Sequence, residues 1–134
     1  MRISKYKQED GTYLDEEGCT YDDAESILIS ILGLCGCGMP DEVLLFVKDA
    51  LELVQDLKEN VWQDKKTYGE WAEDAGRVFR TCGIEYLTWN FLDQKGLLEH
   101  GGSLPGWLTS KGIDFLEDLR EYAKNKAVNQ GQDK

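Results

Sequence analysis

The chain has 134 residues, of which 41% are hydrophobic and 10% aromatic, so it has enough apolar material for one folded core and lacks the composition of a disordered protein. Its formal net charge at pH 7 is −11, and the excess lies in residues 1–60, which carry 5 basic and 14 acidic side chains against 10 and 12 in residues 61–134. A first half with this charge repels nucleic acid.

The sequence contains no segment typical of a protein that enters or crosses a membrane. Its longest apolar run, residues 27–34, is interrupted and far shorter than the roughly 20 residues that span a bilayer. The first residues lack the basic start, apolar stretch and small-residue cleavage site of a secretory signal. We therefore expect a cytoplasmic protein whose cysteines are not paired in disulfides.

Two regions are expected in the first half of the chain, a polar arm and a pair of helices. Residues 1–19 are polar and predict an extended or loosely attached arm, which Tyr6, Tyr13 and Leu14 could hold in place. The first helix is expected to begin at Thr20, whose hydroxyl can cap it, and to end near Gly33. After an irregular glycine-rich turn, Pro40 suits the first position of a second helix that runs to about Lys58. This second helix is apolar around much of its circumference and is the expected core helix.

Two further helices are expected after a charged connector. The first begins at a capping box of Thr67 and Glu70, in which each side chain can satisfy an amide at the start of the helix. Gly83 separates it from the second helix, residues 84–95, and Gly96 supplies the left-handed residue that ends that helix.

A β-hairpin and a last helix complete the expected fold. Residues 97–108 have room for two short strands, and Thr109 or Ser110 can cap the helix that follows. The last helix is expected to fray after Tyr122. The expected plan is an arm over residues 1–19, one mainly α-helical domain with a small β-hairpin over residues 20–126, and a flexible tail over residues 127–134.

Two short patterns flank the expected hairpin, Leu92-x-x-Lys95-Gly96-Leu97-Leu98 and Leu108-Thr109-x-Lys111-Gly112. Together with the order of helix, hairpin and helix, they resemble the C-terminal half of a winged-helix domain of the MarR/PadR type. The resemblance covers roughly the last third of the chain and implies a winged-helix-like fold, in which residues 84–95 would take the place of the DNA-reading helix.

A second resemblance concerns two distant segments, residues 35–42 and residues 96–109. The sequence Cys-Gly-Cys-Gly-Met-Pro-Asp-Glu of the first, together with the glycine-rich second segment, is similar to small uncharacterised proteins encoded by bacteriophages and prophages. This resemblance implies a phage accessory protein in the cytoplasm of the host, and it supplies no substrate or site.

The helix over residues 84–95 is the expected interaction surface. Its apolar residues Ile84, Leu87 and Phe91 are expected to face the core, which leaves an aromatic and acidic outer face. The residues that we assign to binding a protein partner are Tyr86, Trp89, Asn90 and Asp93. Tyr86 and Trp89 combine large apolar area with low entropy loss, as interface anchors do. The alternative for Trp89 is that it packs as ordinary core.

The rival interpretation is a DNA-binding transcription regulator, as a homodimer, that uses the same helix. Arg77, Arg80 and Lys95 would contact phosphates, and Asn90 would contact a base. The carboxylates on the same face disfavour this. A further alternative is that the acidic clusters imitate the phosphates of DNA and inhibit a nucleic-acid-binding protein of the host.

Metal or thiol chemistry would centre on Cys35 and Cys37, with Cys19, Cys82 and His100 as distant ligands. A structural zinc site needs a second ligand pair at short spacing, which the sequence lacks. We therefore expect a packing loop without metal. His100 has no motif partner for catalysis, and we expect neither cofactor nor enzymatic activity. The sequence thus predicts a non-enzymatic, phage-type accessory protein that binds a protein partner.

Overall fold

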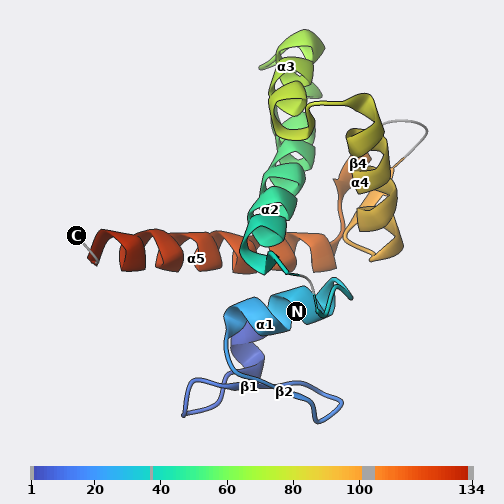
Figure 1. Ribbon diagram of the computed structural model, residues 1–134. Helices are drawn as coiled ribbons and strands as arrows, with labels where there is room; N and C mark the ends of the chain where they lie inside the picture. Colours follow the sequence, from blue (N-terminus) through green and yellow to red (C-terminus); the bar gives the residue numbers. More distant parts are fainter. Residues whose placement is uncertain (1, 37, 101–104, 133–134) are drawn as a thin grey trace. The chain divides into compact units, whose positions relative to one another are not determined.

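The computed structural model describes residues 2–36, 38–100 and 105–132. Over these residues the chain is mainly α-helical, with two small antiparallel sheets of two strands each (Figure 1). The chain forms two compact units, unit 1 with Met1–Leu45 and Glu117–Lys134, and unit 2 with Phe46–Leu116. The expectation of a mainly α fold is confirmed, whereas the sheet in unit 1 was not expected.

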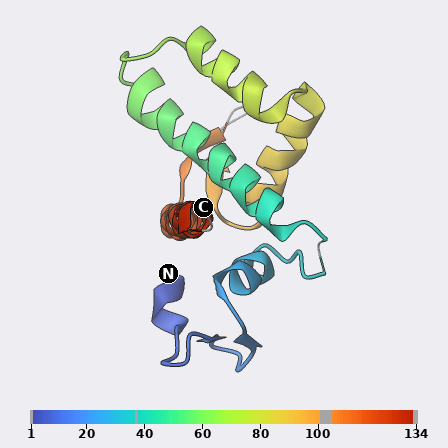
Figure 2. The same cartoon turned by 60° about the vertical axis from the view of Figure 1, so that its left-hand side comes forward.

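Unit 1 begins with three short elements, the 3₁₀ helix η1 (Ile3–Tyr6) and the antiparallel strands β1 (Tyr13–Leu14) and β2 (Thr20–Tyr21). Helix α1 (Ala24–Ile31) follows them (Figure 2). The Asp23 carboxylate caps α1 by accepting the Ser26 amide at 2.9 Å. Thr20, the expected cap, lies in β2 because its backbone pairs with Leu14.

The N-terminal segment is anchored to helix α5 (Ser110–Gln132) through one buried carboxylate, Asp118. One oxygen of Asp118 accepts Arg2 Nε at 2.5 Å, and the other accepts the Ile3 amide at 3.0 Å. Burial raises the pKa of Asp118, and the hydrogen bonds from Arg2 and Ile3 oppose that shift. The side chains of Ile3 and Tyr13 are also buried. The expectation of a loosely attached arm is therefore wrong, because these contacts hold it to residues more than a hundred positions away.

The second half of α5 also joins α1 and the start of helix α2 (Pro40–Asp56). The Tyr122 hydroxyl lies 2.6 Å from a Glu25 oxygen and 2.7 Å from an Asp41 oxygen. Lys126 Nζ pairs with Asp41 at 2.6 Å. These contacts hold the helix as far as Lys126, so the expectation that it frays directly after Tyr122 is wrong, and the helical conformation of α5 continues to Gln132.

Besides the first residues of α5, unit 2 contains the later part of α2 and five further elements that follow it. They are the π-helical turn η2 (Leu57–Val61), helices α3 (Tyr68–Phe79) and α4 (Cys82–Gln94), and strands β3 (Leu98–His100) and β4 (Pro105–Leu108). The two strands form the predicted hairpin, with an irregularity in the pairing after Glu99. The prediction that Pro40 opens the core helix is also confirmed.

Aromatic side chains connect α2, α3 and α4 within unit 2. Trp71 of α3 is 1% exposed, and its Nε1 donates to the Leu53 carbonyl of α2 at 2.8 Å. Phe79, at the end of α3, packs edge-on against Phe46 of α2 at 5.6 Å and against Trp89 of α4 at 4.9 Å between ring centroids. Such edge-on pairs add to the stabilisation by burial alone.

The boundaries of α3 and α4 are set by local side-chain caps. The predicted capping box of Thr67 and Glu70 is present. The break between the helices lies at Arg80, which has φ +68°, and Thr81 caps α4 by accepting the Ile84 amide at 3.2 Å. Gly83, the predicted break, lies inside α4, because the threonine cap starts the helix earlier than the glycine would.

The end of α4 meets the start of α5 at a close contact that we call the Gly112 junction, formed by Gly96, Leu97, Thr109 and Gly112. Gly96 has φ +74° and ends α4 as predicted. Thr109 Oγ1 accepts the Gly112 amide at 3.0 Å and donates to the Gly96 carbonyl at 2.6 Å. A Cβ at Gly112 would lie 1.8 Å from the Leu97 carbonyl oxygen, so only glycine fits this position.

Replacing Gly112 with alanine tests this junction. We expect Gly112→Ala to lower the free energy of unfolding by about 3 kcal/mol, because backbone must move to admit the methyl group. The matched control is Gly76→Ala in α3, where a Cβ meets nothing within 4 Å. This control should stabilise the protein by about 0.5–1 kcal/mol through helix propensity. Urea unfolding of both variants measures the two changes in free energy. Equal changes would contradict the claim that only glycine fits at position 112.

The ion pair at the start of α2 predicts a pH dependence. Hydrogen bonds from Lys126 and Tyr122 lower the pKa of Asp41. A lowered pKa stabilises the folded state above the ordinary carboxyl pKa of about 3.9, and this stabilisation is lost as the pH falls through the lowered value. Asp41→Asn should therefore cost about 0.5–1 kcal/mol at neutral pH and progressively less in acid.

Glu42→Gln is the control for Asp41→Asn, because Glu42 is exposed in the same first turn of α2 and shares its helix-dipole environment. Thermal unfolding of the three proteins across acidic and neutral pH gives the comparison. A cost of Asp41→Asn that stays constant with pH would refute the role assigned to the carboxylate.

Candidate protein-binding surface

Helix α4 turns one apolar face to the core of unit 2 and another to solvent. Trp89 and Leu92 are buried, whereas Ile84, Tyr86 and Leu87 are 45%, 68% and 66% exposed. We call these three exposed residues the α4 face. The expectation that Ile84 and Leu87 point inward is wrong, and Trp89 lies in the core rather than at the surface.

The orientation of α4 follows from the aromatic partner that α3 supplies. Phe79 lies against the Trp89 ring, and the indole nitrogen donates to the Glu85 carboxylate at 3.2 Å, so Trp89 is satisfied both in packing and in hydrogen bonding. The sequence offers two apolar stripes at helical spacing, one through Leu87 and one through Trp89, roughly opposite each other at 3.6 residues per turn. The larger indole occupies the core, and the stripe through Leu87 is left outside.

The polar side chains beside the α4 face donate hydrogen bonds to backbone carbonyls of the same helix. Thr88 Oγ1 donates to the Ile84 carbonyl at 2.7 Å, and Asn90 Nδ2 donates to the Tyr86 carbonyl at 3.0 Å. Covering this surface therefore leaves fewer unsatisfied donors than its sequence suggests. Asn90 was a predicted base-reading residue, and its amide is instead engaged by α4. Asp93, predicted with it, is exposed near the end of the helix.

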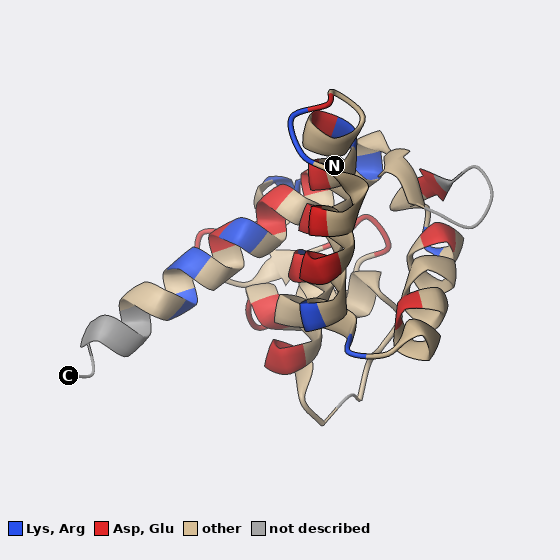
Figure 3. Cartoon of the chain, turned by 90° about the horizontal axis from the view of Figure 1, so that it is seen from above, with Lys and Arg blue, Asp and Glu red and all other residues tan. Residues whose placement is uncertain are grey.

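None of the predicted phosphate-binding residues lies within α4: Arg80 and Lys95 adjoin its two ends, and Arg77 is in the last turn of α3. Arg77 pairs with Asp74 at 3.2 Å, and Arg80 is the exposed residue at the break before α4. Lys95 Nζ lies 5.5 Å from the centre of the Phe91 ring. Figure 3 shows α4 mostly tan, because the charged residues of Cys82–Gln94 are two acids and no base.

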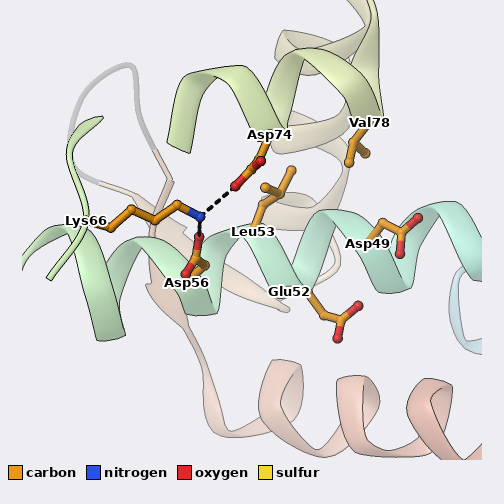
Figure 4. Close-up of a pocket in the computed structure, with 7 residues that line it drawn as sticks. All are labelled: Asp49, Glu52, Leu53, Asp56, Lys66, Asp74 and Val78. Atoms are coloured by element: carbon orange, nitrogen blue, oxygen red, sulfur yellow. Dashed lines mark hydrogen bonds and ion pairs between the residues drawn. The ribbon is translucent and has the colours of Figure 1, made fainter. Parts of the chain in front are cut away.

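A hollow of about 330 Å³ between α2 and α3 is lined by four carboxylates and one lysine (Figure 4). Lys66 lies in the segment between η2 and α3. Its Nζ pairs with Asp56 of α2 at 2.7 Å and with Asp74 of α3 at 2.6 Å, so it links this segment to both helices. These carboxylates raise the pKa of Lys66, and Lys66 lowers the pKa of Asp74. The two ion pairs of Lys66 therefore connect α2 and α3 across this hollow.

The cysteines do not form a metal site within the part of the chain that the structure describes. Cys19, Cys35 and Cys82 are exposed free thiols, each on a different element or loop. Cys37, the second member of the predicted pair, lies outside the described residues, as does the side chain of His100. Cys35 lines a hollow of about 280 Å³ in unit 1 with Tyr21 and Glu25.

No protein-family model, curated protein or solved structure matches this chain. None of the helices over residues 2–36, 38–100 and 105–132 is long and apolar enough to cross a bilayer. The assignment of the α4 face as a candidate surface therefore depends only on the geometry of this structure. The sequence pattern led us to expect Ile84 and Leu87 in the core. Trp89 and Leu92 form a second apolar stripe at helical spacing, and this stripe was the signal that Ile84 and Leu87 could face solvent instead.

The two aromatic residues that were predicted as interface anchors should respond differently to mutation. Trp89→Phe should lower the free energy of unfolding by about 1–2 kcal/mol, because it removes buried indole and the bond to Glu85. Tyr86→Ala should change it by about 0.5 kcal/mol or less, as at other exposed positions. Denaturant unfolding with circular dichroism measures both. Equal destabilisation by the two changes would contradict the observed orientation of α4.

Proposed function

We propose that this chain is a non-enzymatic accessory protein that binds another protein, and that the α4 face is its contact surface. The observation that carries the proposal is the exposure of Ile84, Tyr86 and Leu87 around the solvent-facing half of a helix whose opposite side buries Trp89 and Leu92. Burying a fully exposed leucine or isoleucine side chain contributes about 1.5–3 kcal/mol, and Ile84 and Leu87, at 45% and 66% exposed, can contribute a corresponding part of that to binding. Tyrosine in particular is common at such contacts because it buries much area for two rotatable bonds.

The scaffold proposed for this surface is winged-helix-like. Its support is the order of α3, α4, β3, β4 and α5, together with the Gly112 junction that joins the two patterns resembling winged-helix proteins. A role as a phage accessory protein in the bacterial cytoplasm is supported by the second sequence resemblance. In this proposal the helix in the DNA-reading position has an apolar outer face and serves a protein partner instead.

The rival function is DNA binding by the same helix, and one observation favours it. Arg80 and Lys95 flank the two ends of α4, where residues that hold phosphates would lie on a duplex, and Arg77 is exposed in the last turn of α3. Against it, residues 82–94 contain no lysine or arginine. Fluorescence titration with duplex DNA at rising salt separates the two functions. Binding that weakens steeply with salt supports the rival, and no binding at low salt removes it.

A photo-crosslinking amino acid at position 87 tests the proposed function directly. Expressed in bacterial cells and irradiated, the chain should form an adduct with a protein, because Leu87 lies at the centre of the α4 face. The matched control places the same amino acid at position 128, since Val128 of α5 is 51% exposed. Leu87→Asp in a tagged chain should also abolish recovery of the adduct partner, whereas Val128→Asp should not.

An adduct that forms equally at both positions, or at neither, would overturn the assignment of the α4 face. Leu87→Asp is expected to fold, because the side chain that it replaces is mostly in solvent. Circular dichroism and thermal unfolding of the variant confirm this before the capture is interpreted.

A further inference from the structure

We propose that the contact of Tyr122 with Glu25 and Asp41 takes up one proton as the pH falls, and that this proton lies between Glu25 and the Tyr122 oxygen. We call these three residues and Lys126 the Tyr122 junction. The junction joins α1, α2 and α5 within unit 1. The inference goes beyond the proposed function, because the α4 face belongs to unit 2.

The Tyr122 junction has fewer hydrogens than its short contacts require when both carboxylates are ionised. The Tyr122 oxygen lies 2.6 Å from Glu25 Oε2 and 2.7 Å from Asp41 Oδ1. An O–H donor prefers an angle above about 150°, so one hydroxyl hydrogen serves one of these contacts. Burial and the hydrogen bonds to both carboxylates raise the pKa of Tyr122, so the phenol keeps this hydrogen. The second contact therefore needs a hydrogen from a carboxyl group.

Lys126 determines which carboxyl group supplies that hydrogen. Its Nζ lies 2.6 Å from Asp41 Oδ1, the same oxygen that faces the Tyr122 hydroxyl. Hydrogen bonds from Lys126 and Tyr122 lower the pKa of Asp41, so Asp41 stays ionised and accepts the hydroxyl hydrogen. Over the described residues, no lysine or arginine forms an ion pair with Glu25. Glu25 is therefore the group that holds the added proton and donates it to the Tyr122 oxygen.

The other groups around Glu25 are compatible with an added proton. Glu25 is half-buried and lines the hollow of about 280 Å³ together with Tyr21 of β2 and Cys35 of the loop before α2, so a proton can reach it from solvent. The Tyr21 hydroxyl is engaged by two other side chains, and Cys35 is an exposed thiol. Asp22 and Asp23, at the start of the same helix, add negative charge, which favours protonation.

Proton uptake by the folded junction has a defined effect on stability. Stability falls with rising pH wherever the folded state binds more protons than the unfolded chain. The contribution of Glu25 is therefore present in acid and lost as the pH rises. The contribution of Asp41 has the opposite sign, because its lowered pKa makes it present at neutral pH and lost in stronger acid. The junction is therefore strongest at mildly acidic pH.

Glu25→Gln tests the inference, because its amide group carries at every pH the hydrogen that the carboxylate lacks. The variant should raise the midpoint of thermal unfolding by about 2–4 °C at neutral pH, and this gain should shrink as the pH falls. Glu42→Gln is the matched control, because Glu42 is also an acid in the first turn of a helix of unit 1. Any gain from lowering the net charge of −11 appears equally in the control. A Glu25→Gln protein that is no more stable than the control at neutral pH overturns the inference.

Tyr122→Phe provides a second arm, because it removes the oxygen to which the proton is donated. In this background, Glu25→Gln should give no gain over Tyr122→Phe alone. A gain that persists without the Tyr122 hydroxyl overturns the inference, because the stabilisation then has another source. Circular dichroism shows whether the Tyr122→Phe protein is folded.

Infrared spectroscopy detects the proton itself and uses only Glu25→Gln, Glu42→Gln and the wild type. A protonated carboxyl group absorbs apart from ionised carboxylates. At mildly acidic pH, Glu25→Gln should lose protonated-carboxyl absorption relative to the wild type, and Glu42→Gln should lose less. An equal loss in the two variants, or no loss in Glu25→Gln, overturns the inference and leaves the test of the α4 face unaffected.

Discussion

The contact between Gly112 and the Leu97 carbonyl fixes how α4, the hairpin and α5 join in unit 2. A methyl group at Gly112 would overlap that oxygen, so the first turn of α5 lies directly against the backbone of Leu97, the residue before β3. Thr109 closes the contact by bonding to both the Gly112 amide and the Gly96 carbonyl. Lys111 adds a bond from its ammonium group to the last turn of α4. The end of α4 is thereby held at several backbone atoms.

Fixing the end of α4 also fixes which face of the helix is exposed. At the other end, the Thr81 cap and the packing of Trp89 against Phe79 set the rotation of the helix about its axis. A helix held at both ends presents Leu87 on a rigid surface. Rigidity matters for binding, because side chains that are already placed lose less entropy when a partner covers them. The packing at the Gly112 junction therefore helps to determine which apolar side chains of α4 are exposed.

The features predicted correctly from the sequence depend on neighbouring residues. The capping box at Thr67, the proline at the start of α2 and the glycine after α4 are all decided within a few positions of the chain. The rotation of α4 is different, because two apolar stripes compete and the partner that decides between them, Phe79, lies on another helix. The anchoring of the N-terminal segment is likewise long-range, since Arg2 and Asp118 are 116 positions apart.

The resemblance to winged-helix proteins and the exposed face of α4 lead to different expectations, DNA binding and protein binding, and the charge of the chain favours the second. A helix that reads DNA needs cations on its outer face, whereas the outer face of α4 is apolar and its charged residues are acidic. The negative charge of the rest of the chain keeps most surfaces apart in solution. Association is then favourable mainly where charge is low and apolar side chains are exposed. In this chain these two conditions coincide at α4, which is why the proposed function places the protein contact there rather than on the acidic surfaces.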